Sequence, residues 1–318
     1  MIDAALPYLR CPNCAQPLTR SQQALRCARG HSFDLAKQGY ADLSAGRLPH
    51  HGDSAPMVAD RETFLAAGHY DFIADALAAA APSGFLVDAG VGTGFYLARA
   101  LGETPTPAPG ETPTPAPGET PTPAPGETPT RALGETPTPA PGETPTRPLG
   151  ETPTPAPGET SSGVGLDVSK PALRRAARAH PRAAAVLTDL WRPLPIVDGC
   201  AAAVLNVFAP RNGAEFRRVL RPDGVLLVVT PAAGHLRELV TAYGMIGVDP
   251  DKERRVRSSL DDFFLLKTTK NLKSQMRLNA TEARTLIGMT PSAHHGAGAP
   301  TEDVTVTAEV TLNVYRPV

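Results

Sequence analysis

The sequence predicts an α/β protein built on an open, mostly parallel sheet with helices on both faces. From Phe85 to Thr230, short apolar stretches typical of buried strands alternate with helical segments. The first strand runs directly into a glycine-rich turn, residues 90–94, which opens a helix. Two further segments accompany this core: a cysteine-rich N-terminal region and a tract of proline-rich octapeptides.

Five segments have the short, apolar character of buried parallel strands. They are Phe85–Gly90, Gly163–Val168, Ala184–Asp189, Ala201–Asn206 and Val225–Thr230. Helices are predicted at Phe95–Leu101, Pro171–His180 and Gly213–Leu220, with further helices between Asp53 and Ala81. The alternation of apolar and polar residues over Val304–Tyr315 predicts one long or two short antiparallel strands at an edge of the sheet.

Seven octapeptide units of the type GETPTPAP fill residues 102–157. Removing them joins Leu101 to Gly158 and shortens the separation of Asp88 and Asp167 from 79 to 23 residues, near the ~20 residues of a first βαβ nucleotide-binding unit. We interpret the tract as a disordered insertion loop, because it has no apolar period that could offset its ordering entropy. The alternative is a polyproline arm that binds a partner.

Composition limits the partners and the compartment. The chain has 318 residues and a formal net charge of −1; without the seven Glu and two Arg of the repeats, the remainder carries +4. This mild basicity is compatible with a polyanionic partner without proving one. No stretch approaches the ~18–20 consecutive apolar residues of a membrane helix, and the N-terminus lacks the pattern of a secretory signal. We therefore predict a cytoplasmic protein with no membrane partner.

The spacing Cys11-x2-Cys14-x12-Cys27-x3-His31 predicts a closed, tetrahedral metal site. Two thiolates on one turn and a Cys–His pair on another can surround one Zn²⁺ ion with no open position, so we expect a structural zinc in a small zinc ribbon. Arginines around this segment leave open whether it also binds nucleic acid. Cys200 stands alone in an apolar strand and is predicted to lie in the core.

The glycine turn and the next strand end predict a nucleotide-like cofactor. The backbone of Gly90, Gly92 and Gly94 can approach a ligand closely, and Asp167 could accept hydrogen bonds from ribose hydroxyls. Spacing alone does not separate a dinucleotide from S-adenosylmethionine (SAM). However, Asp88 before Gly90-x-Gly92-x-Gly94 resembles the first motif of class I SAM methyltransferases, which have a Rossmann-like sheet.

That resemblance implies further site residues. Asp189 follows the third strand, where such enzymes contact the adenine, and Asn206 and Phe208 follow the fourth, beside the reacting methyl group. We take Asn206 and Phe208 as candidate pocket residues, with Phe208 either a stacking wall for the target base or simply a core residue. Alternatively, Asp167 and Asp189 could cap the helices that follow them. No catalytic base can be assigned.

Longer motifs carry a more specific resemblance. They are Phe33-Asp-Leu-Ala-Lys-Gln-Gly-Tyr40, Gly52-Asp-Ser-Ala-x-Met57, Arg61-x-x-Phe-Leu-x-x-Gly-His-Tyr70, Leu205-Asn-Val-Phe-Ala-Pro-Arg-Asn212 and Val229-Thr-Pro231-x-x-x-His235. With the cysteine pattern, they make the chain similar to the RlmA family of 23S ribosomal RNA guanine-N1 methyltransferases, and within it to the tylosin- and mycinamicin-resistance enzymes of macrolide-producing actinomycetes. His294-His295 departs from the family, which often has an aromatic-containing stretch there.

The resemblance implies SAM-dependent methylation of N1 of a guanine in a 23S rRNA hairpin loop that lines the peptide exit tunnel, and hence macrolide resistance. It divides the chain into a zinc-binding RNA-recognition domain over 1–46, a helical linker over 47–84 and a methyltransferase domain over 85–318, with the insertion at 102–157. Action as a homodimer stays open. The main alternative is a SAM-dependent small-molecule methyltransferase of a biosynthetic pathway, with a structural zinc.

Overall fold

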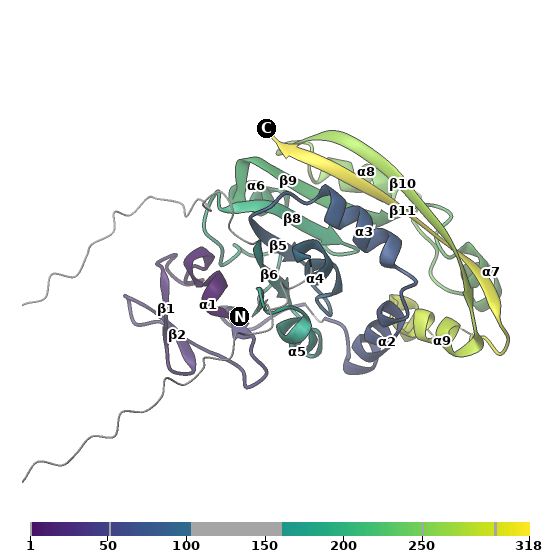
Figure 1. Cartoon of the computed structure of the whole chain (residues 1–318), viewed down its shortest axis with the longest axis horizontal. Helices are drawn as coiled ribbons and strands as arrows, with labels where there is room; N and C mark the ends of the chain where they lie inside the picture. Colours follow the sequence, from purple (N-terminus) through teal and green to yellow (C-terminus); the bar gives the residue numbers. More distant parts are fainter. Residues whose placement is uncertain (1, 51, 103–160, 250, 296–297) are drawn as a thin grey trace, which may run out of the picture. The chain divides into compact units, whose positions relative to one another are not determined.

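The computed structural model describes residues 2–50, 52–102, 161–249, 251–295 and 298–318, with the backbone alone for 294 and 295. The octapeptide tract beyond Gly102 therefore lies outside the described residues. An eight-stranded sheet in the order β10-β11-β9-β8-β5-β6-β7-β4 forms the centre of the fold (Figure 1).

Five parallel strands make the middle of this sheet. They are β5 (Phe85–Ala89), β6 (Ser162–Asp167), β7 (Ala183–Leu187), β8 (Ala201–Val207) and β9 (Leu220–Pro231). The chain runs outward from β5 to β7 and then returns to place β8 on the other side of β5. Open α/β sheets bind ligands beyond the carboxyl ends of the strands at such a reversal. The five predicted strands are confirmed, and the site is expected beside β5.

The C-terminal part corrects one prediction. β11 (Val304–Pro317) is the long antiparallel strand that the alternation predicted, but its predicted position at an edge is wrong. It lies between β9 and β10 (Phe264–Leu278) and is antiparallel to both. The sequence analysis missed β10 because most of its side chains are exposed, so beyond Phe264-Leu-Leu266 it shows neither an apolar run nor a regular alternation.

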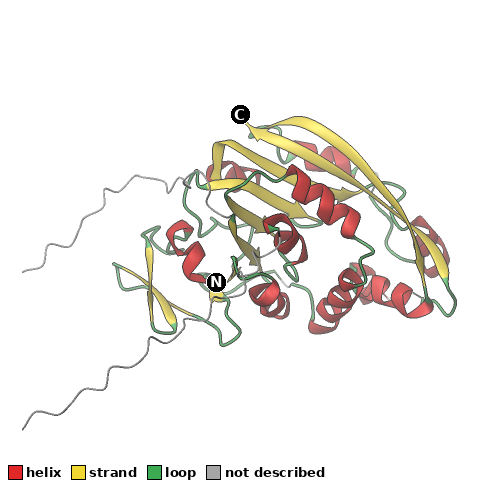
Figure 2. Cartoon of the chain, viewed as in Figure 1, coloured by secondary structure: helices red, strands yellow, loops and turns green. Residues whose placement is uncertain are grey.

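Helices, red in Figure 2, pack on both faces of the sheet. One buried cluster contains residues of α2 (Ala55–Ala66), α3 (Asp71–Ala80), α4 (Phe95–Leu101), α5 (Lys170–Ala179), α7 (Arg237–Tyr243) and α9 (Ala280–Gly288). The other contains residues of α1 (Ile2–Ala5), α6 (Gly213–Val219) and α8 (Lys252–Ser258). Along β5, Leu86 joins the first cluster and Phe85 and Val87 the second, as the two-residue period of a strand requires.

The N-terminal segment forms a three-stranded antiparallel sheet and also joins the main one. β1 (Leu18–Ser21), β2 (Ala24–Cys27) and β3 (Ser32–Asp34) pair in order, whereas β4 (Ala41–Asp42) pairs in parallel with β7. Leu25 and Phe33 belong to the same buried cluster as Val164 and Val186. The core of this small sheet is therefore continuous with one face of the large sheet.

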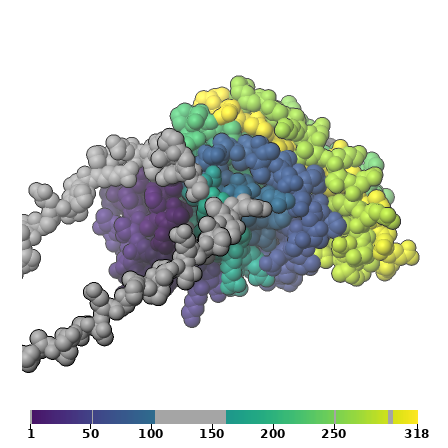
Figure 3. Space-filling view, viewed as in Figure 1, coloured from purple at the N-terminus to yellow at the C-terminus, as the bar shows by residue number. Residues whose placement is uncertain are grey.

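Helices α2 and α3 occupy the predicted helical region before β5. Figure 3 shows them in blue next to the yellow and yellow-green C-terminal segment, where α2 contacts α9 and α3 contacts β10. Across the described ranges, no helix combines the length and the apolar character needed to cross a bilayer.

Both ends of the insertion are anchored by described residues. On one side, Arg182 donates to the Leu101 carbonyl and His180 Nε2 lies 3.1 Å from the Gly102 carbonyl oxygen. On the other, Ser161 Oγ accepts from the Gly84 N–H at 3.1 Å. Gly158 is followed by Glu-Thr, as Gly102 is. After a deletion of residues 102–157, Gly158 follows Leu101 and can therefore replace Gly102 as the hydrogen-bond partner of His180.

We expect deletion of residues 102–157 to leave the melting temperature unchanged or to raise it. A shorter loop loses less entropy when its ends are joined, which lowers the free-energy cost of folding by about 2–3 kcal/mol at most. SAM affinity and methylation should stay within severalfold of the parent. Thermal melting and calorimetry test this. A deletion that also removes the buried Leu101 is the control and should lower the melting temperature. Loss of activity in the first variant would instead identify the tract as a functional arm.

Candidate functional site

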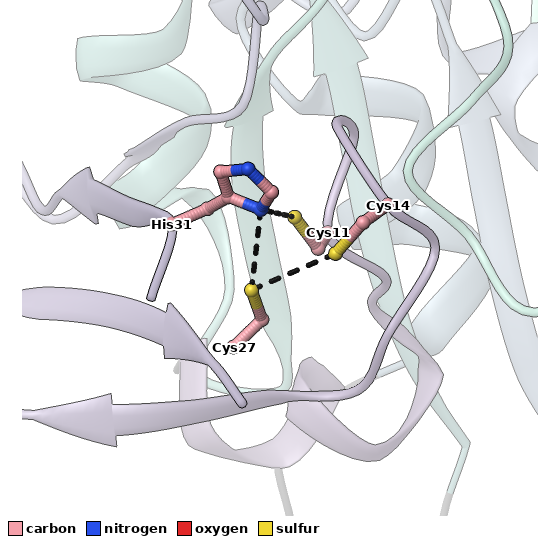
Figure 4. A group of neighbouring side chains, drawn as sticks. All are labelled: Cys11, Cys14, Cys27 and His31. Atoms are coloured by element: carbon pink, nitrogen blue, oxygen red, sulfur yellow. Dashed lines mark hydrogen bonds between the residues drawn. The ribbon is translucent and has the colours of Figure 1, made fainter. Parts of the chain in front are cut away.

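The four residues predicted to bind metal converge in the N-terminal segment (Figure 4). Their ligand atoms all lie within 4.8 Å of one another. Sulfur-to-nitrogen distances are 3.5 Å from Cys11 and 3.4 Å from Cys27 to Nδ1 of His31, and the Cys14 and Cys27 sulfurs are 3.7 Å apart. Ligands around a tetrahedral Zn²⁺ ion are separated by about 3.5–3.8 Å, given the usual zinc–ligand bond lengths. The predicted convergence is confirmed, and the spacing fits zinc.

Two tight turns present these ligands. Cys11 O accepts from the N–H of Ala15 at 2.8 Å, and Cys27 O accepts from the N–H of Gly30 at 3.0 Å. Ala15 and Gly30 both have positive φ values, 57° and 83°. Burial raises the pKa of Cys27, but hydrogen bonds from the backbone at His31 and Arg29 and from the side chains of Cys14 and His31 outweigh this and lower it to about 6. In the same cluster, burial raises the pKa of Cys11 to about 11.

The glycine turn lies at the carboxyl end of β5, where the sheet order reverses. Gly90, Gly92 and Gly94 have φ values of 95°, 54° and 88°. A Cβ at Gly90 would overlap the Cβ of Ala209, and one at Gly94 would lie 2.7 Å from the Cβ of Ala179 on α5. At Gly92, by contrast, the nearest atom to an added Cβ is 3.6 Å away. A Cβ is thus excluded by packing at Gly90 and Gly94, whereas at Gly92 it would make only ordinary van der Waals contact, with Arg61.

Asp88 is a buried carboxylate that lacks a partner. It is 1 % exposed, and neither of its oxygens accepts a hydrogen bond from any described residue. Burial raises its pKa to about 8, and the nearby carboxylate of Asp167 adds to the shift. An orphaned buried polar group is costly unless a ligand satisfies it. A cationic ligand would do so, and SAM carries both a sulfonium and an ammonium group.

Asp167 links the ends of β5 and β6. Its Oδ2 accepts from the N–H of Gly92 at 2.9 Å, and its Oδ1 from the N–H of Ser169 at 2.8 Å. Each oxygen keeps a second lone pair for a ligand. The alternative that Asp167 caps α5 is wrong, because the N-cap of α5 is Ser169, whose side chain accepts from the Ala172 N–H.

Asp189 is buried after β7 and hydrogen-bonds to two described groups. Its Oδ2 lies 2.9 Å from Nδ1 of His50, and its Oδ1 accepts from the N–H of Trp191 at 3.0 Å. No helix follows it directly in the described chain, so the capping alternative is wrong here as well. Its predicted contact with the adenine stays a prediction.

Asn206 lies at the carboxyl end of β8 and Phe208 directly follows the strand, and the two side chains differ in exposure. Asn206 is fully buried, and its Nδ2 donates to the carbonyls of Ala89 at 3.0 Å and Pro210 at 2.8 Å. It thereby joins the end of β5 to the loop after β8, while its Oδ1 has no partner among the described residues. Phe208 is 42 % exposed, with φ of 53°, so the alternative that it is a core residue is wrong.

Two side chains beside Phe208 had no role in the sequence analysis. The ring centroid of Phe208 lies 6.4 Å from that of Tyr70 and 6.0 Å from that of His235. His235 Nδ1 accepts a hydrogen bond from the Glu309 N–H, and burial lowers the pKa of His235 to about 4. The imidazole is therefore neutral with its hydrogen on Nε2, and Nε2 lies 3.4 Å from Tyr70 Oη. Both residues belong to the quoted family motifs, but no spacing in the sequence brings them together.

We expect purified protein to contain about one zinc ion per chain and a Cys14→Ser variant to lose it, because three ligands cannot close a tetrahedral site. Metal analysis by mass spectrometry measures both. Cys200→Ser is the matched control: Cys200 is buried in the core and donates to the Val197 carbonyl, so this variant should keep its zinc. A folded parent without metal would contradict the assignment.

Comparisons with known proteins agree with this geometry. Residues 9–46 match a zinc-ribbon family described as RlmA, N-terminal. A 23S rRNA (guanine-N1)-methyltransferase of Micromonospora griseorubida is 43 % identical, with 98 % of each chain covered. The 23S rRNA (guanine(748)-N1)-methyltransferase of Streptomyces fradiae is 39 % identical, covering 91 % of this chain and 86 % of the relative.

Solved structures are more distant. A SAM-dependent methyltransferase from Aquifex aeolicus has 11 % identity and a TM-score of 0.36, covering 74 % of this chain and 82 % of its own. A geranyl diphosphate methyltransferase in complex with SAM has 13 % identity and a TM-score of 0.39, covering 85 % and 93 %. On the strength of the full-length relatives, the chain belongs to the RlmA family of 23S rRNA (guanine-N1)-methyltransferases.

Proposed function

We propose that this chain transfers the methyl group of SAM to N1 of the 23S rRNA guanine equivalent to position 748, in a hairpin loop that lines the peptide exit tunnel. The observation that carries the proposal is the Streptomyces fradiae relative, which matches 91 % of the chain and is named for that nucleotide. The orphaned carboxylate of Asp88 supports the cofactor, because SAM carries two positive groups, the sulfonium that holds the reacting methyl group and the ammonium of its methionine part.

The cofactor would lie along the carboxyl ends of β5 to β8. In this proposal Asp88 faces the cationic end of the cofactor, and the backbone of the glycine turn, Gly90 to Gly94, lies against the cofactor. Asp167 accepts hydrogen bonds from the ribose hydroxyls, and Asp189 lies beside the adenine. The bound group supplies an electrophilic methyl. The looser packing around Gly92 and the remaining lone pairs of Asp167 support this arrangement.

The RNA would enter on the side of Phe208. Guanine N1 carries a hydrogen in the neutral base, so this hydrogen must leave at or before transfer. A base in a loop can be turned out of its stack at low cost and held against an aromatic ring. The exposed ring of Phe208 suits that role, and Asn206 acts as a positioning residue by joining the two loops that would frame the base.

The zinc ribbon is proposed as the RNA-recognition part, over residues 1–46, with zinc held by Cys11, Cys14, Cys27 and His31. Arg26 and Arg29 are exposed on it and can contact phosphates without disturbing the metal ligands. The helical linker, residues 47–84, then connects this part to the methyltransferase domain over 85–318.

Macrolide resistance follows if the methylated guanine lines the tunnel. An N1-methyl group removes a hydrogen-bond donor and adds bulk where a long macrolide would contact the RNA. Either change can cost about one to three kcal/mol, which is roughly a tenfold or larger loss of drug affinity.

Primer extension on rRNA from expressing cells tests the reaction, because N1-methylguanine cannot pair and stops reverse transcriptase. We expect a new stop at the guanine equivalent to 748, together with greater tolerance of tylosin-like macrolides. Asp167→Ala should weaken SAM binding by about 1–3 kcal/mol and reduce both effects. Asp223→Ala, at an exposed position of β9, is the control and should retain them. With no stop at any guanine, the small-molecule alternative would be favoured.

The pH dependence of SAM binding tests Asp88. Its pKa is raised from 3.8 to about 8, so a cation that prefers the ionised form should bind more tightly as the pH rises toward 8 and level off above it. Without cofactor, the free energy of unfolding should fall as the pH rises from 3.8 to about 8, because in this range only the folded state keeps the proton on Asp88.

We expect the affinity ratio of the parent to an Asp88→Asn variant to rise with pH between about 6.5 and 8, by at most about tenfold per unit. Calorimetry at several pH values measures it. The titration of the ligand's own ammonium group is common to both proteins and cancels in the ratio. A flat ratio would show that Asp88 does not face the cofactor's charge.

A further inference from the structure

We propose that Arg61 binds the α-carboxylate of the methionine part of SAM. This inference rests on the proposed SAM-dependent function and adds a residue that the glycine motif does not contain. Arg61 lies on α2, which precedes β5 in the chain, whereas the expected cofactor residues all follow or belong to the central strands.

The guanidinium lies beside the glycine turn, at Gly92. A Cβ added to Gly92 would lie 3.6 Å from Nη1 of Arg61 and 3.8 Å from its Cδ, and apart from the chain neighbours of Gly92 no other atom of the described residues comes within 4 Å. Arg61 is therefore the described side chain that lies at van der Waals distance from this position. A ligand that covers the backbone of Gly92 would meet the guanidinium at its side.

Two contacts fix the guanidinium and leave part of it available. Nη1 donates to Asp53 Oδ2, and Nη2 donates to the carbonyl of Met289 at 2.9 Å. A guanidinium has five N–H groups, so three are not used by these two contacts. The side chain is 26 % exposed, which means that it is held in place and still reachable by a ligand.

The charges around the turn explain why a cation is needed there. Asp88 and Asp167 both lie at the strand ends, and Asp53 raises the pKa of Asp167 further, while Arg61 opposes that rise. The methionine part of SAM is a zwitterion, with an ammonium and a carboxylate group. Acidic residues alone would attract the first and repel the second. Arg61 supplies the opposite charge, and its planar fork suits a carboxylate.

A purely structural role is the competing explanation, because Arg61 also ties α2 to Met289 at the end of α9. The two roles predict different ligand dependence. Loss of a structural tie would disturb the whole site and weaken every adenosine ligand alike. Loss of a carboxylate partner would weaken only those ligands that carry the amino-acid part.

Calorimetry on the full-length, zinc-loaded protein with two ligands separates these outcomes. S-adenosylhomocysteine carries the amino-acid part, and 5′-methylthioadenosine has the same adenosine and sulfur without it. We expect Arg61→Ala to weaken binding of the first by about tenfold or more and to change the second by less than about twofold. Arg61→Lys should restore part of the loss, because it keeps the charge without the fork.

Arg175→Ala is the matched control. Arg175 forms an exposed ion pair with Glu62, the neighbour of Arg61 on α2, so its loss should leave both affinities unchanged. Equal weakening of both ligands in Arg61→Ala, or no change in either, would overturn the role of Arg61 while the parent still binds S-adenosylhomocysteine. A parent that binds neither ligand would overturn the proposed function itself.

Discussion

The close packing of the glycine turn after β5 is the constraint on which the site depends. Gly90 backs onto Ala209 after β8, and Gly94 onto α5, at distances that leave no room for a Cβ. The carboxyl ends of β5, β6 and β8 are therefore held together, and Asp88 is buried there with no hydrogen-bond partner among the described residues. The free protein bears the cost of that buried carboxylate, and a cationic ligand offsets it. In the proposed arrangement, Asp88 therefore affects both the stability of the free protein and its affinity for the cofactor.

The zinc ribbon is physically connected to this site. Its core residues share a buried cluster with the large sheet, and β4, directly after it, pairs with β7. The same stretch continues to His50, which hydrogen-bonds to Asp189 at the end of β7. Zinc bound by the four ligands would therefore hold in place a segment that reaches the expected adenine end of the site. RNA bound to the ribbon and cofactor bound to the sheet would contact parts of one continuous structure.

The sequence predicted the elements whose signal is local. Buried parallel strands are continuous apolar runs, and the metal ligands follow a fixed spacing, so both could be assigned without the fold. β10 could not, because an edge strand with exposed side chains has no pattern of its own. The neighbours of β11 and the approach of Tyr70 and His235 to Phe208 depend on contacts between distant segments. Arg61 stood in a recognised motif, but only the fold brings it beside Gly92.

The spacing of the glycine motif in the sequence does not distinguish a dinucleotide from SAM as the cofactor, but the hydrogen bonds of the glycine turn do. A pyrophosphate is bound by unused backbone N–H groups at such a turn. Here Gly90 and Val91 both donate to the carbonyl of Leu166, and Gly92 donates to Asp167. The turn therefore offers few donors for an anion, and an anion beside Asp88 would raise the pKa of this buried carboxyl group further, whereas a cation would favour its ionised form. The same features attract a sulfonium and an ammonium group. Electrostatics at this turn thus favour SAM, which is the cofactor that the family assignment requires.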